Sequence, residues 1–154
     1  MPGAKKAAVL ALFVTALVGG VVVARSFGRG GEPELGGFHG VRLGMTASQV
    51  RERFEEPALG TWQSLPTTGA GDVVLSWLAA KGPAEATFEL HNGMLVAVRA
   101  AVPADDVDAK RPKMEASRAV VRTRDVEGDH VRVMLLARDC PTHHAEAERI
   151  AEGK

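Results

Sequence analysis

The densest group of metal-ligating side chains lies at residues 139–144, which read DCPTHH. If a helix begins directly after Cys140, His143 lies three positions on, and a thiolate and one imidazole can meet a metal ion on one face. His144 then points about 100° away from His143, so the two imidazoles cannot share an ion without distortion. Zinc takes four ligands, or three and a water, and no second Cys/His pair accompanies this group. Two interpretations follow: a metal or thiol site of Asp139, Cys140 and His143, or a helix N-terminus with exposed histidines.

Motifs for other chemistry are missing from the sequence. It has no Gly-x-Ser-x-Gly nucleophile elbow, no phosphate-binding glycine motif and no Cys-x-x-Cys-His haem-attachment site. Its single cysteine excludes an intrachain disulfide. Lys and Arg together number 19, as do Asp and Glu, and the resulting net charge of zero disfavours a dedicated nucleic-acid binder. We therefore expect a non-enzymatic protein without a cofactor or a nucleic-acid partner.

Two groups of residues are candidates for binding a partner protein. Met94, Val96 and Val98 alternate along a predicted strand and are expected to leave an apolar face that the helices cover poorly. The second group is a basic stripe on one face of a later strand, formed by Arg118, Arg122 and Arg124. The alternatives are a core position for the apolar group and a solvated strand face for the arginines.

One helix and a loop are predicted at the start of the folded part. Thr46 and Gln49 have the spacing of a capping box, so a helix begins there, and Val50 and Phe54 share its buried face. Residues 56–71 are rich in glycine and proline and are expected to form a surface loop.

The remaining segments predict strands. Asn92-Gly93 is a strong type I′ turn signal, and a hairpin around it places Leu90 opposite Leu95 and Phe88 opposite Ala97. A strand over 72–79, a second hairpin over 118–138 and a helix from 142 complete the prediction. The expected fold class is α+β, in which a small antiparallel sheet of about five strands packs with one or two helices. This domain is expected to span 38–154.

The N-terminal part reads as a membrane anchor and a tether. Residues 7–24 are uncharged and apolar and follow Lys5 and Lys6. As a helix they would span about 27 Å, close to the hydrocarbon core of about 30 Å. We expect a transmembrane signal-anchor, and the alternative is a secretory signal cleaved near Ala24. The glycine-rich residues 25–37 would tether the domain.

The helix start and the first hairpin also carry a resemblance to a known family. Gly44-Met-Thr-x-x-Gln-Val50, a gap with a tryptophan, a strand and a Phe-Glu-Leu-x-Asn-Gly-x-Leu-Val hairpin resemble the BamE (SmpA/OmlA) family over residues 38–102. The resemblance implies a small periplasmic domain that supports outer-membrane β-barrel assembly. Members of that family are lipoproteins with a cysteine directly after the signal sequence, whereas the cysteine of this chain is Cys140.

These observations predict a membrane-anchored bacterial cell-envelope protein with a protein-interaction or assembly domain. It would sit in the inner membrane as a single-pass protein, held by residues 7–24, with the domain in the periplasm and an envelope protein as its partner. The alternative is an exported periplasmic thiol- or metal-binding protein, or an enzyme, that uses Asp139, Cys140 and His143.

Overall fold

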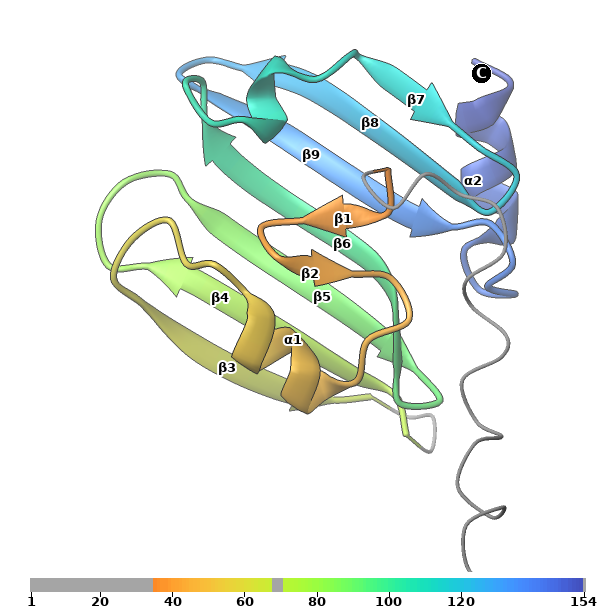
Figure 1. Ribbon diagram of the computed structural model, residues 1–154, viewed down its shortest axis with the longest axis horizontal. Helices are drawn as coiled ribbons and strands as arrows, with labels where there is room; N and C mark the ends of the chain where they lie inside the picture. The colour runs from red at the N-terminus through yellow and green to blue at the C-terminus, as the bar shows by residue number, and fades with distance from the viewer. Residues whose placement is uncertain (1–34, 68–70, 154) are drawn as a thin grey trace, which may run out of the picture.

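A computed structural model describes residues 35–67 and 71–153 of the chain, and this part is built around one antiparallel sheet (Figure 1). Its elements, in chain order, are β1 (Gly37–Phe38), β2 (Val41–Arg42), α1 (Ala47–Arg53), β3 (Gly60–Pro66), β4 (Val73–Ala79), β5 (Glu85–His91), β6 (Met94–Pro103), a 3-10 turn η1 (Asp108–Lys110), β7 (Met114–Ala116), β8 (Val120–Glu127), β9 (His130–Ala137) and α2 (His144–Ala151). Seven strands pair in the order β3-β4-β5-β6-β9-β8-β7, while β1 and β2 form a separate two-stranded sheet.

The two faces of the large sheet are covered by different parts of the chain. The β1–β2 hairpin and α1 lie over one face, which we call the inner face (Figure 1). On the other, outer face, α2 packs against β8 and β9. The outer face of β3 and β4 has no helix over it among the described residues, and there Leu65 and Leu78 are more than half exposed.

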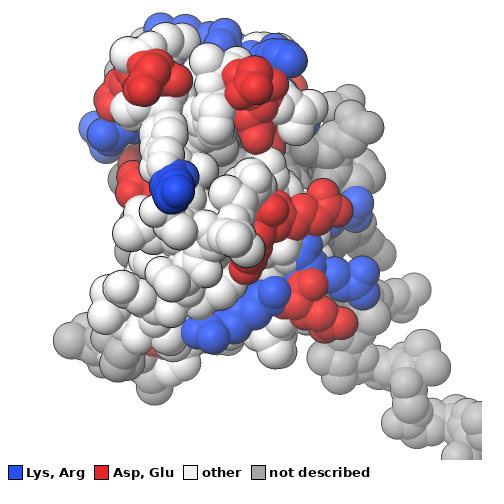
Figure 2. Space-filling model, turned by 90° about the vertical axis from the view of Figure 1, so that its left-hand side faces the viewer, with Lys and Arg blue, Asp and Glu red and all other residues white. Residues whose placement is uncertain are grey.

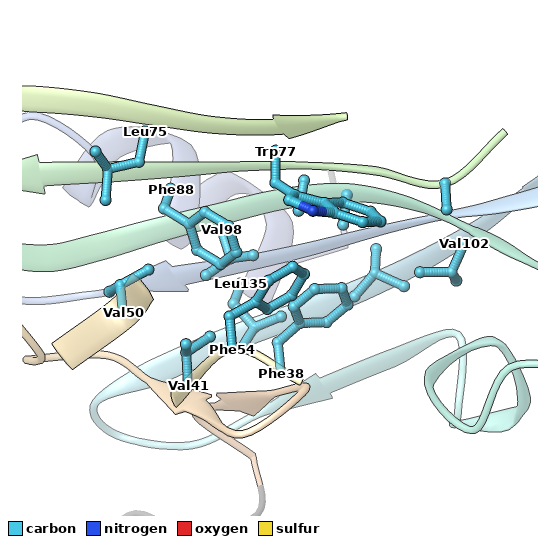
Figure 3. Packing of buried hydrophobic residues seen from close by; sticks show 14 of the residues in the cluster. Phe38, Val41, Val50, Phe54, Leu75, Trp77, Phe88, Val98, Val102 and Leu135 are labelled. Carbon is cyan, nitrogen blue, oxygen red and sulfur yellow. The ribbon is translucent and has the colours of Figure 1, made fainter. Parts of the chain in front are cut away.

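The main hydrophobic core lies between the sheet and its inner cover. Phe38 and Phe54 reach from β1 and the end of α1 toward Trp77 and Phe88 of the sheet (Figure 3). Trp77 is 1% exposed, as its position within a strand predicts. Gly60 is required beside it, because a Cβ at this position would lie 2.5 Å from the indole.

The predicted start of α1 and the predicted turn of the first hairpin are both confirmed. In the capping box of α1, the Thr46 N–H donates to Gln49 Oε1 at 2.9 Å and the Gln49 N–H donates to the Thr46 hydroxyl at 3.4 Å. Val50 and Phe54 are both buried. The hairpin turn has positive φ at Asn92 and Gly93, 50° and 77°, as a type I′ turn requires.

The expected fold class is wrong: the described chain is mostly β rather than α+β with about five strands. The segment 56–71, expected to be a loop, contains the edge strand β3. That strand gives little periodic signal, because Trp62 is its one large residue directed at the core. The strands β1, β2 and β7 are two or three residues long, too short for an alternating pattern to appear.

The predicted pairing of the first hairpin is correct at its turn and wrong beyond it. Leu90 pairs with Leu95 as expected, but Phe88 pairs with Val98 rather than with Ala97. A bulge at Val96 inserts one extra residue into β6, so the side chains after it change faces. Sequence alternation alone does not reveal such an insertion.

The anchor prediction concerns residues that the structure does not describe. None of the helices among residues 35–67 and 71–153 is long and apolar enough to cross a membrane. The segment 7–24 lies outside these ranges, as do residues 25–34 of the predicted tether. The transmembrane helix in the expected fold class is therefore not found among the described residues.

Candidate metal centre

Three side chains that commonly bind transition metals meet on the outer face of the sheet. His91, Cys140 and His143 each present one ligand atom, and all three atoms lie within 4.8 Å of one another. The Cys140 Sγ is 3.3 Å from the His91 Nδ1, and the two imidazole rings stack with their centroids 5.2 Å apart. Cys140 and His143 are buried, whereas His91 is partly exposed.

The local structure explains why these three residues converge. His91 is the last residue of β5 and shares the outer face with Glu89, since strand side chains alternate. The chain turns after β9, and the amide groups of His143 and His144 donate to the Cys140 carbonyl at 3.0 and 2.8 Å. This turn places both the thiol and the His143 ring over the end of β5.

The predicted Cys140–His143 pair is therefore brought together, with differences in detail. The helix α2 begins at His144 rather than directly after Cys140, and His143 is its N-cap residue. His144 is exposed, and its Nδ1 lies 2.8 Å from the Arg138 carbonyl, so only one of the two adjacent histidines faces the cluster. Asp139 is exposed and is not part of the cluster.

Sequence reasoning missed His91, which lies 49 residues before Cys140. His91 directly precedes the Asn92-Gly93 turn, a position at which a histidine is ordinarily solvated. The available signal was the pair Glu89-x-His91 on the polar face of an otherwise apolar strand, which places a carboxylate and an imidazole side by side.

Two carboxylates and one guanidinium surround the His143 ring. The Nε2 of His143 is 3.2 Å from Glu89 Oε2, and its Nδ1 is 3.7 Å from Glu146 Oε2. Arg99 joins both acids: Nη1 pairs with Glu89 Oε1, and Nη2 lies 3.0 Å from Glu146 Oε2. Burial lowers the pKa of His143, and the nearby Arg99 and His91 lower it further, which favours a neutral imidazole.

The apolar candidates for partner binding are divided by the bulge. Val98 is 1% exposed and belongs to the main core, together with Phe88 and Leu135 (Figure 3). Met94 and Val96 are partly exposed. The expected face shared by Met94, Val96 and Val98 is therefore wrong, because Val98 points to the covered side.

The predicted basic stripe does not form one exposed surface either. Arg118 precedes β8 and is exposed, but Arg122 is 1% exposed and ion-pairs with the buried Asp108. Arg124 is partly buried and donates to the Ala109 carbonyl at 2.9 Å. These arginines lie on the side of the sheet that faces the inner cover. Strand alternation predicts that they share a face, but it does not predict that this face is buried.

A second group of possible ligands, His39, Asp106 and Asp108, lies beside Arg122. His39 Nε2 is 3.1 Å from Asp106 and 3.6 Å from Asp108. The Arg122 guanidinium also donates to the Gly37 carbonyl at 2.7 Å. We interpret this group as an ion-pair network that holds β1 against the sheet, because a guanidinium already neutralises the Asp108 carboxylate.

Comparison with protein-family models, curated proteins and solved structures finds no match for the chain. The face shown in Figure 2 carries both acidic and basic side chains, interspersed among uncharged ones, rather than a patch of one charge. The cluster of His91, Cys140 and His143 is thus the feature of the described chain with the most specific chemistry.

Proposed function

We propose that the domain binds a zinc-class divalent ion through His91, Cys140 and His143, and that the ion fastens α2 to β5. The observation that carries this proposal is the convergence of three soft or borderline ligand atoms within 4.8 Å. His91 lies 49 residues before Cys140, so only the fold brings it to the Cys140–His143 pair.

The chemistry of the three residues supports this choice of ion. A thiolate and two neutral imidazoles are typical zinc ligands, with Zn–S about 2.3 Å and Zn–N about 2.0–2.1 Å. At a tetrahedral angle these bond lengths place sulfur and nitrogen about 3.6 Å apart. The observed distance between Cys140 Sγ and His91 Nδ1 is 3.3 Å, so a small rotation of either side chain admits the ion.

Metal titration of the purified full chain, in mild detergent, tests the proposal. We expect one Zn²⁺ per chain and a loss of affinity beyond about 100-fold in Cys140→Ser, more than outer-shell changes produce. His144→Gln is the matched control, since His144 is adjacent in sequence but exposed and directed elsewhere. Equal zinc binding by the native chain and by Cys140→Ser would contradict the proposal.

A membrane-tethered interaction domain is a second candidate function, supported by the outer face of β3 and β4. There Leu65, Val74 and Leu78 share one face, and Leu65 and Leu78 are 57% and 52% exposed. Neighbouring exposed apolar side chains of this kind mark partner sites.

Crosslinking in cells tests this second candidate. We expect Leu78→Lys to reduce capture of an envelope protein by the full chain, and removal of residues 7–24 to release the domain from the membrane fraction. Lys substitution of Ser48, an exposed residue of α1 on the opposite side of the sheet, is the control for added charge. Unchanged capture by Leu78→Lys would contradict a docking role for this face.

A further inference from the structure

The two edges of the large sheet differ in how they are protected against pairing with another chain. The edge strand β7 has three residues, Lys113 precedes it, and its Glu115 ion-pairs with Arg111 at 2.9 Å. Short length, charge and proline are the usual protection of a sheet edge. The opposite edge strand, β3, has seven residues, none of residues 57–71 is charged, and Pro66 is only its last residue. No described strand pairs with its free side, so β3 is a long and unprotected edge (Figure 1).

The backbone of β3 presents a row of hydrogen-bonding groups on this free side. Just before the strand, the Leu59 carbonyl accepts from the Ala80 N–H at 2.8 Å. Just after it, the Thr67 N–H donates to the Asp72 carbonyl at 3.4 Å. Hydrogen-bonded and non-hydrogen-bonded residues alternate along an antiparallel pair, so the odd-numbered residues bond toward β4. The backbone N–H and C=O groups of the even-numbered residues therefore point away from β4, and these residues include Gly60, Trp62 and Ser64.

The side chains of this strand match themselves when two copies run antiparallel. Residues 59–65 read LGTWQSL, in which a leucine, a small residue and a polar residue approach Trp62 from each side. A twofold axis at Trp62 places Leu59 opposite Leu65 of the second copy. These leucines are 86% and 57% exposed, and cross-strand pairing would shield each with the other. The strand thus has the self-complementarity that a contact between identical chains requires.

We propose that β3 pairs with β3 of a second copy of this chain, antiparallel and centred on Trp62, so that the two sheets become continuous. The free backbone groups then bond in pairs, Gly60 with Ser64 of the second copy and Trp62 with its own counterpart. Arg51 lies 5.7 Å from the Trp62 ring centroid and Glu56 accepts from its indole N–H at 2.8 Å, so the charges beside the axis are of opposite sign. This contact does not depend on the metal site, and it uses the edge of β3 rather than the outer face of β3 and β4.

A proline substitution tests the backbone pairing in the full chain. Ser64→Pro removes an N–H that points away from β4, a position at which an edge strand tolerates proline. A symmetric dimer loses two such donors, so we expect its dissociation constant to rise at least about 10-fold. Analytical ultracentrifugation in mild detergent measures this constant. Ser64→Ala keeps the N–H and is the matched control, expected to dimerise like the native chain.

A side-chain substitution tests the same contact without a change in the backbone. Leu59 is 86% exposed, so Leu59→Lys should leave the fold intact while it removes two cross-strand leucine pairs from each dimer. We expect the dimer to weaken by about 2- to 30-fold. Ser48→Lys adds the same charge to exposed α1 and should dimerise like the native chain. Thermal unfolding of each variant checks that the chains compared are folded.

Disulfide crosslinking determines the register. Chains with Thr61→Cys mixed with chains with Gln63→Cys should crosslink, because the register centred on Trp62 makes these positions a non-hydrogen-bonded pair with Cα atoms about 4.5 Å apart. Each of these variants alone should crosslink far less. The native chain, in which Cys140 is 5% exposed, is the control for background crosslinking.

Weaker dimers in both edge variants, together with the mixed crosslink, would support the proposal. A native chain that stays monomeric at every accessible concentration would overturn it. A dimer that Ser64→Pro and Leu59→Lys both leave intact would also overturn it, because that dimer forms through another surface. Crosslinking of Gln63→Cys alone, without the mixed crosslink, would place the axis at Gln63 and overturn the register centred on Trp62. If Ser64→Pro does not fold, Leu59→Lys and the crosslink decide the question.

Discussion

At the scale of single residues, Arg122 and Asp108 form a buried ion pair away from the cluster of His91, Cys140 and His143. Arg122 is 1% exposed and Asp108 is 6% exposed. Burial raises the pKa of Asp108 above its ordinary value, and Arg122 opposes that shift. A buried charge that loses its partner destabilises a protein far more than the pair stabilises it.

We predict that Arg122→Leu lowers the free energy of unfolding by about 3–5 kcal/mol, because Asp108 is left without its counter-ion. The loss should depend on pH. A carboxyl with a raised pKa binds its proton more tightly in the folded state, so stability falls as pH rises from 3.8 through the raised value.

Denaturant unfolding at about pH 5 and about pH 8 measures this effect, and the larger loss is expected at the higher pH. The double variant Asp108→Asn with Arg122→Leu removes the titrating group and should flatten the difference. A loss in Arg122→Leu that is independent of pH would show that Asp108 is not the source of the cost.

At the scale of elements, the capping box makes a separate contribution to α1. Thr46→Ala removes the acceptor of the Gln49 amide and should cost about 0.5–2 kcal/mol of unfolding free energy. Thermal or denaturant unfolding is the measurement. Glu52→Ala, an exposed position of the same helix, should stay within about 0.5 kcal/mol of the native chain. Equal stability of Thr46→Ala and the native chain would contradict the contribution of the cap.

The contrast between α1 and β6 shows how much the sequence could predict. The cap, the Asn92-Gly93 turn and the second hairpin depend on residues close in the chain, and all three were predictable. The bulge at Val96 depends on how β6 fits between β5 and β9, so alternation predicted the wrong face for Val98. The cluster of possible metal ligands was half predicted for the same reason: Cys140 and His143 are neighbours in sequence, whereas His91 joins them only through the fold.

The bulge itself leads to a prediction about β6. Val98→Lys places an ammonium group in the main core without a partner and should cost several kcal/mol. Val96→Lys adds the same charge at a partly exposed position and should be tolerated better. Thermal unfolding compares the two variants. A similar decrease in melting temperature for both would contradict the division of β6 by the bulge.

At the scale of the whole molecule, the apolar contact that covers the inner face of the sheet is larger than the one that covers the outer face. The inner face packs against aromatic residues, including Phe38 and Phe54. The outer face receives α2 through a small apolar contact, in which Ala147, Ile150 and Ala151 meet Ala97, Val121 and Leu136. The helix has eight residues, and isolated helices shorter than about 12–15 residues are marginal in water. Its position therefore depends on ion pairs, such as Arg138 with Glu148 at 2.7 Å, and on the proposed metal ion.

Zinc should consequently stabilise the whole domain and α2 in particular. With free zinc at 100 times its dissociation constant, mass action raises the unfolding free energy by about 2.7 kcal/mol, if the ion binds only the folded state. Hydrogen exchange of the full chain should slow most in α2 and at the end of β5, the two segments that the ion joins, and a chelator should reverse the change. Cys140→Ser should show neither effect, while His144→Gln should show both. Slower hydrogen exchange throughout the sheet, without added protection of α2, would contradict the view that the ion fastens this helix. A site that joins α2 to β5 must protect α2 first, because α2 is the less stable of the two elements.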